Sequence, residues 1–217
     1  MADKKVKICY GKIEIEPSKN IPATNLRGFL GYLFVNEPEF HHHTTSPFHY
    51  PLIQYKKLDG KLLVMGLNDY AKIVFNKISK LESIVATNEK IRILNVDLTT
   101  NTHEVSEKNI QYRFITPWLA LNKKNYSTYK TLEKNQRRQF LENILVGNFL
   151  SALKGLSVFI DFKIHVEIKK FRSIKTVAHE NEFQAFYVEV TTNISLPRYI
   201  GVGKSVSKGF GTLEVLK

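Results

Sequence analysis

The first hundred residues alternate between strand-like and helix-like patterns in an order that constrains the fold more than any other feature of the sequence. Residues 6–17 alternate apolar and polar side chains, as a half-buried strand does. Helical spacing in residues 24–35 is followed by two strand-like runs that meet at Asp59-Gly60, a strong turn signal. A second helical spacing covers residues 69–83, and another strand-like run covers residues 88–105. The predicted order is β-α-β-β-α-β, the order of the ferredoxin-like fold.

The second half of the sequence opens in a similar way. Residues 110–122 form a strand or a strand with a bend, and residues 131–154 carry the strongest apolar stripe of any predicted helix. Two long strand-like runs follow at residues 162–176 and 183–194, and a short one ends the chain at residues 212–217. This pattern predicts a second ferredoxin-like unit whose second helix is weak or missing.

The predicted fold class is α+β, with tandem ferredoxin-like (RRM-like) domains and a glycine-rich C-terminal loop. A chain of 217 residues suits two domains of about 100 residues each. We expect the N-terminal domain to span residues 1–106 and the C-terminal domain to span residues 107–217. The sequence shows no signal peptide and no apolar run of about 18 residues, and Cys9 is the only cysteine, so we expect a cytoplasmic protein without a membrane span.

Positive charge is concentrated in the second half of the chain. The net charge of the whole chain is +12. Residues 1–108 hold 15 Lys/Arg and 12 Asp/Glu, whereas residues 109–217 hold 17 Lys/Arg and 8 Asp/Glu, a net charge of +9. A basic surface attracts polyanions, and we therefore predict nucleic acid as the partner of the second domain.

Four glycines punctuate the end of the chain in the segment GVGKSVSKGFG, residues 201–211. Its Gly-Lys-Ser tripeptide also closes a nucleotide-binding P-loop, but that motif needs a glycine five residues before Gly203, where this sequence has Arg198. Too few residues follow Gly211 for the helix that caps the phosphates. The sequence therefore disfavours a P-loop.

The composition of this glycine-rich loop suits the backbone of a nucleic acid. Glycine permits positive φ angles and close approach to a ligand, and successive backbone N–H groups can form a concave anion site. Lys204 and Lys208 add charge, and Ser205 and Ser207 can donate hydrogen bonds to phosphates. The alternative is an ordinary hairpin turn, although eleven residues is long for one.

Several segments resemble a known family. Residues 196–215, LPRYIGVGKSVSKGFGTLEV, resemble the C-terminal loop of the RAMP superfamily, the RNA-binding proteins of CRISPR systems. Residues 50–68, YPLIQYKKLDGKLLVMGLN, together with residues 114–122 and 142–156, resemble one largely archaeal subfamily of repeat-processing endoribonucleases. The resemblance covers nearly the whole chain. It implies a RAMP fold and an enzyme that cuts precursor CRISPR RNA within each repeat.

A run of three histidines, His41, His42 and His43, follows the first predicted helix. One interpretation is a metal site, although adjacent histidines do not readily face one ion and Cys9 is the only thiol. A second is a polar loop without a chemical role. The third is acid–base catalysis on RNA, whose 2′-hydroxyl is its own nucleophile. Histidine, with an ordinary pKa of about 6.5, can accept or give a proton at neutral pH.

The resemblance favours the third interpretation, since the family is described as metal-independent, leaving a cyclic phosphate and a 5′-hydroxyl. Its catalytic histidine follows the first helix. Two histidines separated by one residue map onto His41 and His43, and a shift by one keeps His42 as a candidate. Tyr50 orients the phosphate or a histidine, or else packs in the core. Lys56 is a candidate charge stabiliser, but a solvated strand lysine is the preferred interpretation.

The predicted partner is CRISPR repeat RNA, and the resemblance also allows a homodimer or assembly into an effector complex. A non-catalytic RNA-binding RAMP subunit of such a complex is the alternative function. No cofactor, metal ion or membrane is predicted. The predicted RNA-binding residues are Arg137, Arg138, Arg198, Gly201, Gly203, Lys204, Ser205, Ser207, Lys208 and Gly209.

Overall fold

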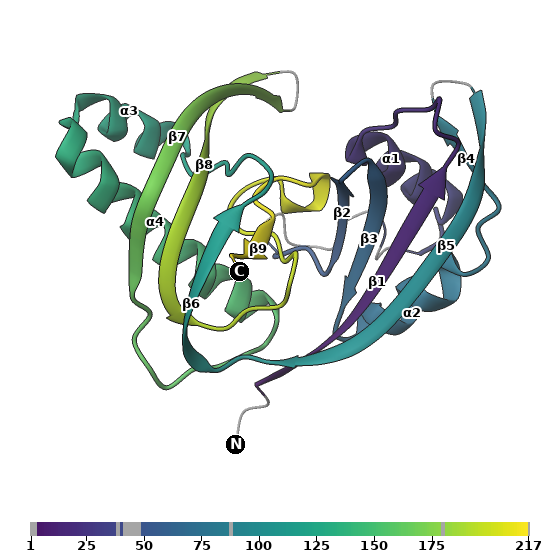
Figure 1. Ribbon diagram of the computed structural model, residues 1–217, viewed down its shortest axis with the longest axis horizontal. Helices are drawn as coiled ribbons and strands as arrows, with labels where there is room; N and C mark the ends of the chain where they lie inside the picture. Colours follow the sequence, from purple (N-terminus) through teal and green to yellow (C-terminus); the bar gives the residue numbers. More distant parts are fainter. Residues whose placement is uncertain (1–3, 38–39, 41–48, 87–88, 179–180, 217) are drawn as a thin grey trace. The chain divides into compact units, whose positions relative to one another are not determined.

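A computed structural model describes residues 4–37, 40, 49–86, 89–178 and 181–216, which form two compact units (Figure 1). The N-terminal unit comprises Lys5–His103 and also Ser207–Gly209 from the glycine-rich loop. The C-terminal unit comprises Glu104–Val206, the residues that follow Gly209 and, from the start of the chain, Lys4. The loop that sequence reasoning assigned to the second domain therefore contributes three residues to the first unit.

The N-terminal unit is built on a five-stranded sheet. Its hairpin turn is formed by Asp59 and Gly60, whose φ angles of 49° and 79° are those of a tight two-residue turn and agree with the predicted turn signal. The strand order is β2-β3-β1-β5-β4. The strands are β1 (Lys5–Ile15), β2 (Ile53–Leu58), β3 (Lys61–Leu67), β4 (Ser83–Ala86) and β5 (Glu89–Glu104).

Two helices, α1 (Ala23–Leu33) and α2 (Asp69–Ile78), pack against this sheet. Leu26 and Leu30 from α1 and Val74 from α2 are fully buried in one core with the strands. Each helix therefore buries one face, which explains the helical spacing of its apolar residues. Helix α1 begins after Pro22 without a side-chain cap.

The C-terminal unit is built on a four-stranded sheet with the order β7-β8-β6-β9. If β4 is set aside as an extra edge strand, both sheets follow the same order of second, third, first and last strand. The C-terminal strands are β6 (Glu107–Phe114), β7 (Val166–Ala178), β8 (Asn181–Ile194) and β9 (Leu213–Val215). The repeated order confirms the predicted tandem ferredoxin-like architecture.

Helices α3 (Lys123–Thr131) and α4 (Lys134–Gly155) lie beside β7 and β8 in Figure 1. Helix α4 begins with a capping box, in which the Glu133 and Gln136 side chains and backbone N–H groups bond reciprocally. Between β8 and β9 the described residues contain only a short 3₁₀ turn, Val206–Lys208, in place of a second long helix. Helix α3 was not predicted, and the strongest predicted helix begins at Lys134 rather than at residue 131.

An aromatic cluster forms the core of the C-terminal unit. Trp118 is fully buried, stacks on Phe114 at 5.2 Å between ring centroids, and lies 6.1 Å from Phe186. Its indole N–H donates to the Asn148 side chain of α4 at 3.0 Å. Trp118 therefore ties the segment after β6 to both the sheet and the long helix.

Candidate functional site

The three candidate catalytic histidines, His41, His42 and His43, lie outside the described residues. On one side of the run, Phe40 is buried and lies 4.7 Å from Phe34 between ring centroids. On the other side, the described chain resumes at His49, immediately before Tyr50. The candidate site can therefore be built from the residues of the N-terminal unit that are described.

Tyr50 is half-buried and takes part in a local hydrogen-bond network. The Gln54 side-chain amide donates to the Tyr50 hydroxyl at 2.9 Å and to the Pro51 carbonyl at 3.1 Å. Burial raises the pKa of the Tyr50 hydroxyl, although the hydrogen bond from Gln54 opposes this shift. The phenol is therefore neutral at physiological pH and keeps a proton that it can donate in a hydrogen bond.

Lys56 is fully buried on β2, which overturns the preferred interpretation of this residue as a solvated strand lysine. Residues Ile53, Gln54, Tyr55 and Lys56 are buried in succession, so both faces of this part of β2 are covered. Burial disfavours the charged ammonium and lowers the Lys56 pKa from 10.5 to about 7. A lysine with this pKa exchanges its proton near neutral pH.

Arg27 of α1 also belongs to this region, and sequence reasoning missed it. Its Nε atom is buried and has no hydrogen-bond partner among the described residues. Burial lowers the pKa of Lys208, and the charge of Arg27 lowers it further. Arg27 also acts electrostatically on the Tyr55 hydroxyl, whose pKa is raised by burial. Arg27 and Lys208 thus give the N-terminal unit a small cationic cluster with a donor suited to an anion.

The glycines of the loop are explained by packing. Gly203, Gly209 and Gly211 have φ angles of +97°, +92° and +65°, which disfavour other residues. A Cβ atom on Gly203 would lie 2.7 Å from the Trp118 indole nitrogen, and one on Gly211 would lie 2.0 Å from the Val202 carbonyl oxygen. A Cβ on Gly209 would lie 3.0 Å from the carbonyl oxygen of Tyr55 in β2. The loop is a folded segment with close backbone approaches.

The remaining predicted residues of the loop differ in their surroundings. Lys204 donates from its side chain to the Leu121 carbonyl at 3.2 Å, and burial lowers its pKa. Ser205 adopts a φ angle of +55°, and Ser207 is half-buried in the 3₁₀ turn. Gly201 is buried and pairs with Thr212 in an isolated bridge. These contacts make Gly201 a structural position and place Lys204 in the C-terminal unit.

The three predicted arginines also have separate surroundings. Arg198 pairs with Glu214 at 3.3 Å and lies over the Tyr199 ring. Arg137 donates to the Leu132 carbonyl at 2.9 Å, at the end of α3, so its guanidinium supports the connection between the two helices. Arg138 is exposed on α4.

Two further properties bear on the site. Among the residues the structure describes, no group of three His, Cys, Asp or Glu side chains is placed to hold a metal ion. None of the described helices is both long and apolar enough to cross a membrane.

Comparisons with known proteins identify the class of fold and then the family. The architecture matches that of solved RAMP and Cas6 proteins, including Thermus thermophilus Cas6, with a TM-score of 0.59 and 14% identity over 100% of both chains. The chain therefore has the tandem ferredoxin-like fold of these proteins. Family models of the Cas6b N-terminal domain and the Cas6b C-terminal domain match residues 5–104 and 104–216. The chain belongs to the Cas6b family, which confirms the resemblance seen in its sequence.

Two solved structures and one further relative support this assignment. A crystal structure of Cas6b matches with a TM-score of 0.90 and 27% identity, covering 98% of this chain and 100% of that chain. A CRISPR RNA processing endoribonuclease Cas6b matches with a TM-score of 0.76 and 26% identity, covering 97% of this chain and 100% of the other. An uncharacterized protein of Methanocaldococcus jannaschii is 40% identical over 109 residues, which are 50% of this chain and 74% of that protein.

Proposed function

We propose that this protein is an endoribonuclease that cuts precursor CRISPR RNA within its repeats. Membership of the Cas6b family and the similarity to a Cas6b described as a CRISPR RNA processing endoribonuclease support the proposal. The observation that carries the chemistry is the fully buried Lys56, with a pKa of about 7, on the strand that follows the histidine run. This lysine lies in the same unit as Arg27 and Lys208.

The proposed reaction uses the 2′-hydroxyl next to the scissile phosphate as the nucleophile. A base removes the 2′-hydroxyl proton, the 2′-oxygen bonds to phosphorus, and the bond from phosphorus to the 5′-oxygen breaks. An acid gives its proton to the departing 5′-oxygen, which leaves a 2′,3′-cyclic phosphate and a 5′-hydroxyl. Proton transfer of this kind needs groups that titrate near the working pH.

The histidine run and Lys56 supply such groups. His43, with His41 or His42, takes the roles of base and acid, because the ordinary pKa of histidine is about 6.5. Lys56 is fully buried, so in its charged form it stabilises the negative charge that develops on the phosphate oxygens through its electric field and not by contact. The proton transfers in this scheme do not require a metal ion.

Tyr50 and the cationic cluster take supporting roles. The Tyr50 hydroxyl, held by Gln54, orients the phosphate or a histidine through a hydrogen bond. Arg27 and Lys208 hold the phosphates around the cut by charge and hydrogen bonds. Repeat RNA is therefore the proposed partner. Three points stay predictions: a homodimer, assembly into an effector complex and a cytoplasmic location. Light scattering with and without repeat RNA tests whether the protein forms a homodimer.

A cleavage assay in EDTA tests the proposal. Repeat RNA labelled at its 5′ end should be cut once and carry a cyclic phosphate on the labelled product. RNA with a 2′-deoxy nucleotide before the cut should bind but stay intact. Loss of cleavage in EDTA would contradict the metal-free mechanism, and tight binding without any cleavage by the wild type would favour the non-catalytic RNA-binding subunit.

Matched variants separate the roles of the residues. His43→Ala should abolish cleavage and leave RNA binding nearly unchanged, whereas His49→Ala, outside the run, should cut normally. Lys56→Met should lower the rate by about 100-fold or more, in the range of a lost charge stabiliser. Lys57→Met is its control, because Lys57 follows on the same strand and bonds to the Asn20 side chain. Equal cleavage by Lys56→Met and Lys57→Met would remove Lys56 from the mechanism.

A further inference from the structure

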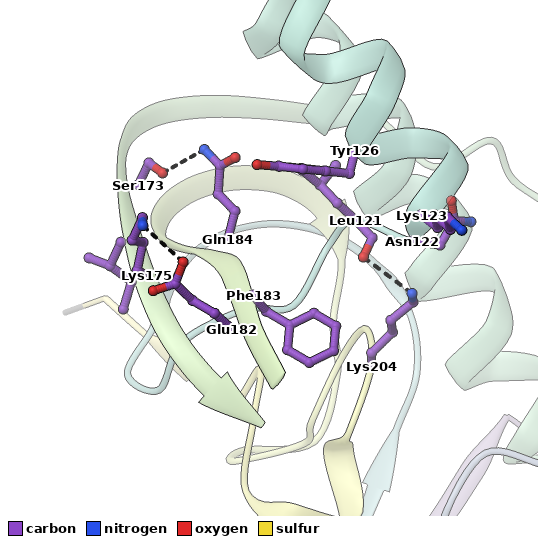
Figure 2. Close-up of a pocket in the computed structure, with 11 residues that line it drawn as sticks. Leu121, Asn122, Lys123, Tyr126, Ser173, Lys175, Glu182, Phe183, Gln184 and Lys204 are labelled. Atoms are coloured by element: carbon purple, nitrogen blue, oxygen red, sulfur yellow. Dashed lines mark hydrogen bonds and ion pairs between the residues drawn. The ribbon is translucent and has the colours of Figure 1, made fainter. Parts of the chain in front are cut away.

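A cavity of about 490 Å³ lies in the C-terminal unit, separate from the residues of the proposed cleavage chemistry (Figure 2). It is enclosed by the start of α3, the end of the β7–β8 hairpin and Lys204 of the glycine-rich loop. The side chains that line the cavity include Lys123, Tyr126, Ser173, Phe183, Gln184 and Lys204; Glu182 and Lys175 also line it and pair with each other at 2.8 Å.

The cavity exists because a neighbouring segment leaves the edge of β8. Trp118 and Phe186 exchange both backbone hydrogen bonds, at 2.8 Å and 3.0 Å, and the chain after Trp118 then departs towards α3. Backbone groups on one edge of a strand recur at every second residue, so the N–H and C=O of Gln184 point to the same edge as those of Phe186. The Gln184 backbone therefore presents a donor and an acceptor to the cavity.

Two aromatic rings face the opening. Tyr126 on α3 is 40% exposed, and Figure 2 shows it on the opposite side of the cavity from the ring of Phe183. Lys130, which does not line the cavity, lies over the Tyr126 ring at 4.9 Å from its centroid and helps to hold it. Exposed aromatic faces in a basic groove are the usual stacking platform for unpaired bases.

The polar side chains indicate which bases fit. The Gln184 side-chain nitrogen donates to the Ser173 hydroxyl at 2.8 Å, and the side-chain oxygen is directed towards the hydroxyl end of Tyr126 (Figure 2). This oxygen is a hydrogen-bond acceptor, which suits the exocyclic amino group of adenine, cytosine or guanine, whereas uracil has no exocyclic amino group and offers only its ring N3–H as a donor. Lys204 and Lys123 supply positive charge at another side of the cavity, where a phosphate can lie.

We propose, on the basis of the RNA-processing function above, that this cavity binds one unpaired nucleotide of the RNA strand whose base carries an exocyclic amino group. The base stacks on Tyr126, its amino group donates to Gln184, and the adjoining phosphate lies against Lys204. The site reads a base with residues that take no part in the proposed cleavage chemistry and thereby helps to select the RNA.

Fluorescence anisotropy with short labelled RNAs tests this proposal. The probes are oligoadenylate, oligouridylate and an abasic ribose-phosphate strand, each of about 12 nucleotides. The wild type should bind oligoadenylate most tightly. Tyr126→Ala should weaken oligoadenylate binding by about 5- to 100-fold and leave binding of the abasic strand unchanged. Tyr126→Phe keeps the ring and should bind oligoadenylate like the wild type. Gln184→Ala should remove the preference for adenylate over uridylate.

Three comparisons distinguish base recognition in this cavity from general attraction of RNA to a basic surface. Phe159→Ala removes an aromatic ring that is 68% exposed in the same unit but does not line the cavity, and it should bind like the wild type. Lys204→Ala should weaken the binding of all three RNAs by the same factor, as expected for a phosphate contact. Equal losses of oligoadenylate and abasic RNA in Tyr126→Ala, or binding of free AMP that oligoadenylate does not displace, would overturn the proposal.

The result is separable from the cleavage proposal. If the wild type fails to cut repeat RNA but Tyr126→Ala still weakens oligoadenylate binding, the cleavage proposal is refuted and the nucleotide site stands. If the wild type, Tyr126→Ala and Gln184→Ala cut repeat RNA at the same rate, bind it with the same affinity and show no preference for adenylate, the nucleotide site is refuted and the cleavage proposal stands.

Discussion

The buried Lys56 makes the stability of the N-terminal unit depend on pH in a defined direction. In the folded protein its pKa is about 7, and in the unfolded chain it returns to about the ordinary value of 10.5. Between these values the unfolded chain binds the proton and the folded protein does not, so the free energy of unfolding rises with pH. Well below pH 7 the buried charge is fully present and the unit is least stable. The penalty is removed as the pH rises through 7 towards 10.5.

The size of this effect follows from the two pKa values. A difference of one bound proton changes the free energy of unfolding by about 1.4 kcal/mol per pH unit. Because the folded lysine is half-protonated at pH 7, raising the pH from about 7 to about 9 should stabilise the unit by about 2 kcal/mol through this residue. Lys56→Met removes the titrating group, so its unfolding free energy should lack this contribution.

The assay is urea unfolding of the wild type and Lys56→Met at the two pH values, followed by far-ultraviolet circular dichroism. Tryptophan fluorescence is unsuitable, because the single tryptophan, Trp118, lies in the C-terminal unit. Lys57→Met is the control and should keep the pH dependence of the wild type. If the wild type and Lys56→Met change in parallel between the two pH values, Lys56 has an ordinary pKa and its proposed role near neutral pH is refuted as well.

Three further changes give direct tests. Gly211→Ala should destabilise the protein by about 2 kcal/mol or more, because its φ of +65° is unfavourable and the new Cβ would meet the Val202 carbonyl oxygen; an unchanged melting temperature would refute this. Tyr112→Phe should cost about 1–3 kcal/mol in urea unfolding, because its buried hydroxyl accepts from the Leu196 N–H at 2.8 Å and donates to the Leu196 carbonyl at 3.3 Å. Lys208→Ala should reduce the salt dependence of RNA binding by about one phosphate contact, and an unchanged slope would exclude that contact.

The elements that the sequence predicted well are those with a clear apolar period. Helix α1 shows its buried face at Leu26 and Leu30, and the β2–β3 hairpin shows its turn at Asp59 and Gly60. Helix α3 could not be predicted in the same way, because Tyr129 is its only buried residue and the period is absent. Strand β4 has four residues, which is too short to display an alternation.

The candidate site was less predictable, because burial of a charged residue depends on segments far away in the sequence. The pattern Gln54, Tyr55, Lys56 on β2 gives no local sign that both faces of the strand are covered. The backbone of Gly209 approaches the Tyr55 carbonyl closely, although about 150 residues separate the two in the sequence. Arg27 was missed for the same reason, since its surroundings include Lys208 from that distant loop.

The glycine-rich loop shows why composition alone is a weak guide to ligand contact. Gly203, Gly209 and Gly211 are required by close backbone and ring packing, and this requirement would hold in a RAMP protein that binds no RNA through its loop. The glycines therefore account for the shape of the loop and say little about phosphate binding. The chemistry resides in the lysines between them: Lys204 lines a cavity in the C-terminal unit, whereas Lys208 lies near Arg27 in the N-terminal unit. Because the two lysines belong to different units, substituting each one separately tests the phosphate contact of one unit at a time.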